Sequence, residues 1–107
     1  FFTARDVAKH GMQPAIDSIP NGAKVIFSID VDGLDPTLVP GVILPAPGGV
    51  GYQQMLDLIE GVARRAQIVG ATFVEFVPEN DIQGIGARAI ARLASVLIAA
   101  IGQQVNH

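Results

Sequence analysis

The chain has 107 residues, which is enough for one domain at most. Half of its residues are apolar and only 16% are charged, so we expect a piece of a larger core or one subunit of a tight oligomer, because a small soluble domain needs more polar surface. The net charge is −3, and the seven lysines and arginines are scattered, which excludes a basic stripe for binding nucleic acid. The absence of cysteine excludes disulfides and thiolate–zinc sites.

No segment is predicted to enter a membrane. The longest apolar run, residues 96–101, is far shorter than the ~20 residues that span a bilayer. The N-terminus lacks the basic and apolar regions of a signal peptide. The sequence therefore predicts a soluble, cytoplasmic protein.

The first half of the chain predicts a helix, a strand and a long loop. Residues 6–19 carry apolar side chains at helical spacing, and Pro20 ends them. Residues 24–30 (K-V-I-F-S-I-D) are nearly all apolar and predict a buried strand, and residues 1–3 are expected to end another. Residues 31–51 are rich in proline and glycine, and a loop of this length usually has a function.

The second half predicts a helix, a strand and a helix. Residues 52–69 form an amphipathic pattern with one apolar stripe. Residues 71–77 (A-T-F-V-E-F-V) predict a second buried strand. Residues 85–101 predict a helix that faces Ile98 and other apolar side chains inward and ends at Gly102.

This order of elements is typical of an α/β protein with a parallel sheet. Strands of such a sheet read as continuous apolar runs because helices cover both faces. Two or three strands do not make a stable sheet of this kind alone. Ligands bind at the carboxyl ends of the strands, where the loop of residues 31–51 begins.

Two aspartates follow the first predicted strand. In an extended chain, Asp30 and Asp32 project to the same side, ~6.6 Å apart. Hard divalent cations favour such oxygen ligands, and a bound cation relieves the repulsion between the carboxylates. A solvated turn is the alternative, because Asp-Gly and Asp-Pro are strong turn formers. Asp35 precedes Pro36 and is expected to shape the turn.

Glu75 is the second candidate site residue. It lies within an apolar run, F-V-E-F-V, where a carboxylate needs a metal, a cavity or a buried salt bridge with an arginine. Its place near the end of the predicted strand puts it on the same rim as Asp30 and Asp32.

Three segments together resemble the ureohydrolase family of arginases, agmatinases and formiminoglutamases. Residues 28–36 (S-I-D-V-D-G-L-D-P), followed by a loop ending in P-G-G, resemble the family motif S-x-D-x-D-x-x-D-P. Residues 74–81 (V-E-F-V-P-E-N-D) are similar to the E-x-x-P segment of the last strand, and residues 2–6 (F-T-A-R-D) to the segment before the penultimate strand. The resemblance implies a three-layer α/β/α parallel-sheet fold, in which residues 1–107 are the C-terminal part of a single arginase-like domain with only its last strands and helices.

The resemblance also implies the chemistry. Asp30 and Asp32 match two metal-ligating aspartates, one of which bridges two Mn²⁺ ions, so Asp32 also belongs to the catalytic centre. Glu75 matches the glutamate that orients the guanidinium of the substrate. The ions lower the pKa of a bridging water, and the hydroxide attacks the guanidino carbon to give urea and an amine. The implied substrate is agmatine or a related guanidino acid.

The sequence departs from the family in two respects. It lacks the G-G-D-H and D-A-H-x-D motifs that supply the remaining ligands, and His10 and His107 are expected to be bystanders. We therefore expect residues 1–107 to be inactive without the rest of the polypeptide to which they belong. We also expect the complete protein to form a homo-oligomer. Residues 41–45 read G-V-I-L-P where agmatinases and arginases commonly carry G-T-G-T-P, which leaves the amidino substrate open.

Two alternatives remain open at this point. The D-x-D-G pattern after an apolar strand also resembles Mg²⁺-dependent phosphatases of the haloacid dehalogenase type, although Leu34 departs from their motif and no lysine follows Lys24. The chain could instead be a non-catalytic structural or oligomerisation piece, in which Asp30, Asp32 and Glu75 are vestigial.

Overall fold

The computed structural model describes residues 4–43 and 48–105. Its elements in chain order are α1 (Ala4–His10), α2 (Gln13–Asp17), β1 (Lys24–Asp30), the 3-10 turn η1 (Val31–Gly33), α3 (Tyr52–Arg65), β2 (Gln67–Val74), the 3-10 turn η2 (Pro78–Asn80) and α4 (Ile85–Val105). The strand predicted at residues 1–3 and His107 lie outside the described residues.

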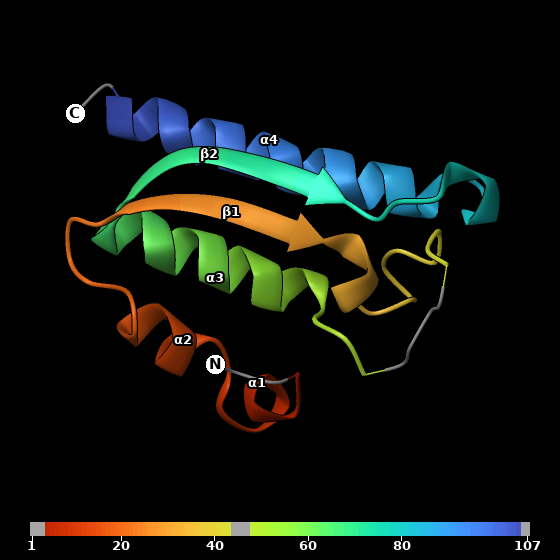
Figure 1. The fold of residues 1–107 in the computed structure, drawn as a ribbon, viewed down its shortest axis with the longest axis horizontal. Helices are drawn as coiled ribbons and strands as arrows, with labels where there is room; N and C mark the ends of the chain where they lie inside the picture. The colour runs from red at the N-terminus through yellow and green to blue at the C-terminus, as the bar shows by residue number, and fades with distance from the viewer. Residues whose placement is uncertain (1–3, 44–47, 106–107) are drawn as a thin grey trace.

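The two strands form a parallel sheet, and α3 and α4 pack together against one of its faces (Figure 1). The register pairs Lys24 with Gln67 and Asp30 with Val74. Both carboxyl ends therefore lie at the same edge, where the loop of residues 31–51 begins. The strand predicted at residues 24–30 is confirmed, because β1 has these bounds.

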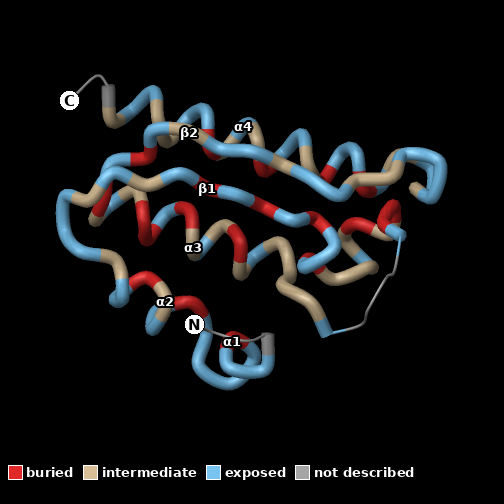
Figure 2. The backbone as a smooth tube through the Cα atoms, viewed as in Figure 1, coloured by how far each residue is buried: buried red, intermediate tan, exposed pale blue. Residues whose placement is uncertain are grey.

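A single core fills the space between the sheet and the two long helices, where Figure 2 shows the buried positions facing one another. Phe27 and Ile29 point from β1 into it. The helices contribute Ile59 from α3 and Leu93 from α4, both fully buried. Ile98 does not join them: its side chain is 70% exposed because a helix turns by ~100° per residue and Leu97 already faces inward.

The other face of the sheet is uncovered in the described part of the chain. On this face Ile26 is 66% exposed and Val74 is 41% exposed. Within the described residues, helices cover only one face of the strands, as expected for a part of the predicted three-layer α/β/α fold. Parallel sheets almost always bury both faces, so this open face marks a layer that these residues do not provide.

The helix α4 is long and apolar enough to cross a membrane by length and composition. In this structure the helix packs on the sheet and on α3. Leu93 and Leu97 are buried against the sheet and α3, and the exposed face carries Arg88 and Arg92. The first half of α4 is therefore amphipathic, whereas the apolar residues Ile98 and Ala99 further along are exposed.

The single helix predicted over residues 6–19 is wrong, because Gly11 divides it into α1 and α2. Gly11 has φ +70°, and its N–H donates to Val7 O at 2.8 Å, which ends α1. Pro14 then occupies the first turn of α2, where its missing N–H costs no helical hydrogen bond. A helix interrupted by Gly and restarted at Pro keeps its apolar spacing, which is why periodicity alone does not reveal the break.

The boundary between α3 and β2 also differs from the prediction. The helix ends at Arg65 and not at residue 69, and the strand covers Gln67–Val74 and not residues 71–77. Gly22 N donates to Arg65 O, and Gln67 N donates to Ala23 O, both at 2.8 Å. The residues just before β1 therefore bind the backbone at the end of α3 and start the pairing of the two strands. Pairing with β1 thus overrides the helical periodicity of residues 66–69.

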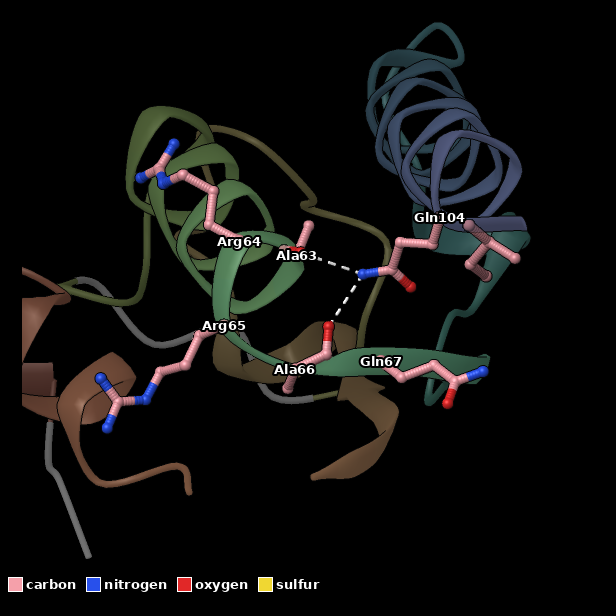
Figure 3. Close-up of a pocket in the computed structure, with 7 residues that line it drawn as sticks. Ala63, Arg64, Arg65, Ala66, Gln67 and Gln104 are labelled. Carbon is pink, nitrogen blue, oxygen red and sulfur yellow. Dashed lines mark hydrogen bonds between the residues drawn. The ribbon is translucent and has the colours of Figure 1, made fainter. Parts of the chain in front are cut away.

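The helix α4 continues to Val105, so Gly102 does not end it as predicted. Gln104 explains the extra turn. Its side-chain Nε2 donates to Ala63 O at 3.0 Å and to Ala66 O at 2.8 Å (Figure 3). Its Oε1 accepts from Ile68 N at 2.9 Å. One side chain therefore satisfies backbone groups at the end of α3 and at the start of β2.

Replacing Gln104 by alanine is expected to destabilise the fold by about 1–3 kcal/mol, because it leaves three partly buried backbone groups without partners. Urea unfolding of the full-length gene product, followed by circular dichroism, measures the loss. The control is Gln103→Ala, which changes an exposed neighbour on the same helix. Equal effects of the two substitutions would contradict this role of Gln104.

Candidate functional site

The predicted metal ligands lie at the carboxyl end of β1. Asp30 is the last residue of the strand, on the open face of the sheet, and Asp32 lies in η1. Both residues are exposed. The prediction that Asp30 and Asp32 project to the same side of an extended chain is wrong, because the backbone turns into η1 directly after Asp30. Neither carboxylate makes a hydrogen bond or ion pair within the described residues, so both keep their oxygens available.

Glu75 lies at the carboxyl end of β2, one residue beyond the partner of Asp30. It therefore shares the edge of the sheet with Asp30 and Asp32, as predicted, across strands ~4.8 Å apart. The prediction that Glu75 is buried inside a strand is wrong, because the strand ends at Val74 and the Glu75 side chain is exposed. The cause is its backbone, whose φ of +70° breaks the alternation of side chains along β2.

These residues fit a divalent cation in part. Asp30 and Asp32 supply hard carboxylate oxygens close together in the chain. Within residues 4–43 and 48–105, however, no group of three or more His, Cys, Asp or Glu side chains gathers around a possible ion position. The described residues therefore supply at most part of a metal centre. His10 is exposed on α1, where it lines a hollow together with Asp57, Glu60 and Arg64 of α3.

Asp35 organises the long loop next to the candidate ligands. Its Oδ1 accepts from Thr37 N at 3.0 Å and from Thr37 Oγ1 at 2.7 Å, and its Oδ2 accepts from Gly48 N at 3.1 Å. The Thr37 hydroxyl and backbone N–H, with the N–H groups of Gly48 and Gly49, hold the pKa of Asp35 below its usual value against the opposing effect of burial. The prediction that Asp35 shapes the turn is confirmed.

The loop closes tightly where its two ends meet. Leu34 and Val50 form an isolated parallel bridge, in which Asp35 N donates to Val50 O at 2.9 Å and Val50 N donates to Gly33 O at 3.1 Å. A Cβ on Gly49 would stand 2.7 Å from the backbone carbon of Leu34, so only glycine allows this approach.

The stability of this loop is expected to depend on acid. The pKa of Asp35 is lower in the folded state than its unfolded value of about 3.9. The ionised carboxylate therefore contributes to the stability of the folded state above roughly pH 3.9, and this contribution is lost as the pH falls through the folded pKa. Asp35→Asn should therefore reduce the slope of stability against pH below about pH 4. Urea unfolding midpoints between pH 2 and 6 measure it, and an unchanged slope would count against the role of this carboxylate.

The sequence reasoning does not single out Asp81, which fixes the segment after Glu75. Its Oδ1 accepts from Gly86 N at 2.9 Å and its Oδ2 accepts from Ala87 N at 3.1 Å, at the start of α4. Burial alone would raise the pKa of Asp81, but these hydrogen bonds, one from Ile82 N and the charge of Arg88 together lower it. An aspartate a few residues before an apolar helix is the sequence signal for such a cap.

A cavity of about 450 Å³ lies at the other edge of the sheet, at the amino end of β2 (Figure 3). Its lining includes Ala63, Arg64, Gln67 and Gln104. The Gln104 amide already bonds to backbone groups, so it is not free to bind a ligand. None of the predicted site residues lines this cavity.

Comparison with known proteins gives one consistent result. Residues 1–100 match the family model described as the Arginase family. The chain is 49% identical over 60 residues to N(1)-aminopropylagmatine ureohydrolase of Thermus thermophilus, covering 56% of this chain and 20% of that protein. It is 40% identical over 80 residues to mitochondrial arginase 1 of Arabidopsis thaliana, covering 74% of this chain and 23% of that protein.

The fold agrees with the sequence matches. The crystal structure of a hypothetical agmatinase from Burkholderia thailandensis superposes with a TM-score of 0.83 at 31% identity, covering 94% of this chain and 32% of that chain. The chain thus spans between a fifth and a third of the length of these relatives. The described helices and parallel strands are a part of this larger α/β architecture.

Proposed function

The chain belongs to the arginase family, and from this premise we propose that it is part of a hydrolase that cleaves a guanidino compound to urea and an amine with two manganese ions. The observation that carries the proposal is the shared edge of the sheet, where Asp30, Asp32 and Glu75 lie at the ends of neighbouring strands. Ligands of open α/β sheets bind at this edge.

In the proposed centre, Asp30 and Asp32 hold the ions through their carboxylates. Both side chains are exposed and make no hydrogen bond within the described residues, so metal binding would not have to break an existing contact. Bound manganese would supply a water of lowered pKa as the nucleophile.

Glu75 is proposed to bind the guanidinium of the substrate. A guanidinium is a planar cation, and a carboxylate can accept two parallel N–H donors from it. The exposed Glu75 side chain at the end of β2 is available for this contact. Binding at a fixed carboxylate would orient the guanidino carbon toward the metal centre.

The rest of the centre is proposed to come from elsewhere in the same chain, and residues 1–107 alone are expected to be inactive. The partial set of ligands in the described residues and the share of the relatives' length that the chain spans support this expectation. The substrate class is proposed from the printed names of the relatives, which include an N(1)-aminopropylagmatine ureohydrolase and an arginase. Cytoplasmic location and a homo-oligomeric state are further parts of this proposal.

Urea release by the full-length gene product, with and without added Mn²⁺, tests the proposal. The substrate panel is agmatine, N(1)-aminopropylagmatine and arginine, with residues 1–107 alone as the inactive control. Manganese-dependent urea from one of them is the expected result. No urea from any of the three would overturn the proposal and would favour the non-catalytic structural role.

A further inference from the structure

Glu75 has an unusual backbone for the residue proposed to bind substrate. Its φ of +70° lies in the left-handed region, which a glutamate rarely adopts. Such a conformation costs free energy and persists only where the surrounding structure holds it. The residues that hold Glu75 in this conformation therefore also set the position of its carboxylate.

The next residue, Phe76, is fixed from two sides by glycines. A Cβ on Gly41 would stand 2.8 Å from Phe76 Cε1, and a Cβ on Gly86 would stand 3.2 Å from the same atom. The first distance is shorter than van der Waals contact allows. The ring thus occupies a narrow slot between the loop of residues 31–51 and the start of α4, and it also packs against the main core.

Hydrogen bonds also join the loop of residues 31–51 to the residues that follow Glu75. Val77 N donates to Gly41 O at 2.6 Å, and Asn80 Nδ2 donates to Val42 O at 3.2 Å. Glu75 is therefore followed at once by two residues that are tied to residue 41. A shift of the loop at Gly41 must move Phe76 or Val77, and with them the backbone of Glu75.

We propose that the slot formed by Gly41, Phe76 and Gly86 positions the Glu75 carboxylate for the guanidinium. The inference rests on the proposed function of Glu75. It couples Gly41 and the adjoining residues 42 and 43, where the chain departs from the common family sequence, to the contact with the substrate. Gly41, Phe76 and Gly86 are positioning residues, because they act through Glu75.

Gly41→Ala in the full-length gene product is the test. Adding the methyl group should displace the Phe76 ring and raise KM for the most active amidino substrate of the panel by roughly 10- to 100-fold, because a small misplacement of a binding group is costly. The manganese content should stay unchanged, since the three atoms nearest to the added methyl group belong to Phe76, Val77 and Asp81 and not to Asp30 or Asp32. Gly102→Ala is the matched control, because no atom lies within 4 Å of its added Cβ.

A second substitution separates positioning from a loss of stability. A Cβ on Gly41 would stand 2.8 Å from Phe76 Cε1 and 2.9 Å from Val77 O. Phe76→Leu removes only the first of these contacts, so the double variant Gly41→Ala/Phe76→Leu should recover part, but not all, of the lost KM. Urea unfolding of each variant measures stability separately, and a KM that rises and recovers while the unfolding midpoint stays constant is the result that supports positioning. If Gly41→Ala does not fold, Phe76→Leu alone should raise KM several-fold at unchanged manganese content, and an unchanged KM overturns the inference.

Glu75→Gln distinguishes failure of the inference from failure of the proposed function. If Glu75→Gln raises KM but Gly41→Ala does not, the slot is not a positioning device and only the inference fails. If Glu75→Gln leaves KM unchanged, the proposed role of Glu75 itself fails. A raised KM in both variants, with recovery in the double variant, supports both.

Discussion

Asp32→Asn in the full-length gene product is expected to lower kcat/KM for urea release by more than about 100-fold, because an amide is a much poorer ligand than a carboxylate for a hard divalent cation. The same change at Asp30 is expected to have an effect of similar size. Both variants should also bind less manganese, which metal analysis after gel filtration measures.

The matched control is Asp57→Asn, which changes an exposed aspartate on α3 whose carboxylate, among the described residues, accepts a hydrogen bond only from Gln53 in the same helix. This variant should keep the activity and the metal content of the parent. Full activity of Asp32→Asn would show that the carboxylates at the end of β1 form a solvated turn and not a metal site.

Leu93→Ala is the substitution expected to destabilise the fold most, by about 3 kcal/mol, because it leaves a cavity in the core between the sheet and α3. Leu93 is fully buried, so its removed atoms lose all of their contacts. Urea unfolding followed by circular dichroism measures the change.

Ile98→Ala on the same helix is the control for Leu93→Ala. Its side chain is 70% exposed, and the substitution should change stability by less than about 0.5 kcal/mol. A larger loss at Ile98 than at Leu93 would mean that the outer face of α4 is buried in the assembled protein, as the predicted oligomer would allow.

The fold class could be predicted from the sequence because its main cues are local. The apolar run of residues 24–30 predicts β1 with its observed bounds, and the S-I-D-V-D-G-L-D-P motif after it identifies the family. Membership in the arginase family also removes the phosphatase alternative. The cues are strong because a buried strand and a ligand-bearing turn each need particular residue types at fixed spacing.

The boundaries that could not be predicted depend on contacts that are distant in sequence. The end of α3 is set by hydrogen bonds from residues 22 and 67 and by the side chain of Gln104. The continuation of α4 past Gly102 has the same origin. Helical periodicity in residues 66–69 carries no information about these partners, which lie 36 or more residues away for Gln104.

In the candidate site, too, local sequence patterns could be predicted and features that depend on the folded backbone could not. Asp30, Asp32 and Asp35 could be found because Asp-rich turns after strands have a recognisable pattern, and the role of Asp35 in the turn is confirmed by its bonds to Thr37 and Gly48. The exposure of Glu75 could not be found, because it follows from a left-handed backbone that no residue type near it requires. The roles of Asp30, Asp32 and Glu75 in catalysis stay predictions.

The most direct test of the account is a crystal structure of the full-length gene product with Mn²⁺, with anomalous diffraction recorded at the manganese edge. The proposed metal site predicts two anomalous peaks within bonding distance of the carboxylates of Asp30 and Asp32, on the edge of the sheet that also carries Glu75. Peaks at another place, or no peak at this edge despite bound manganese in solution, would contradict it.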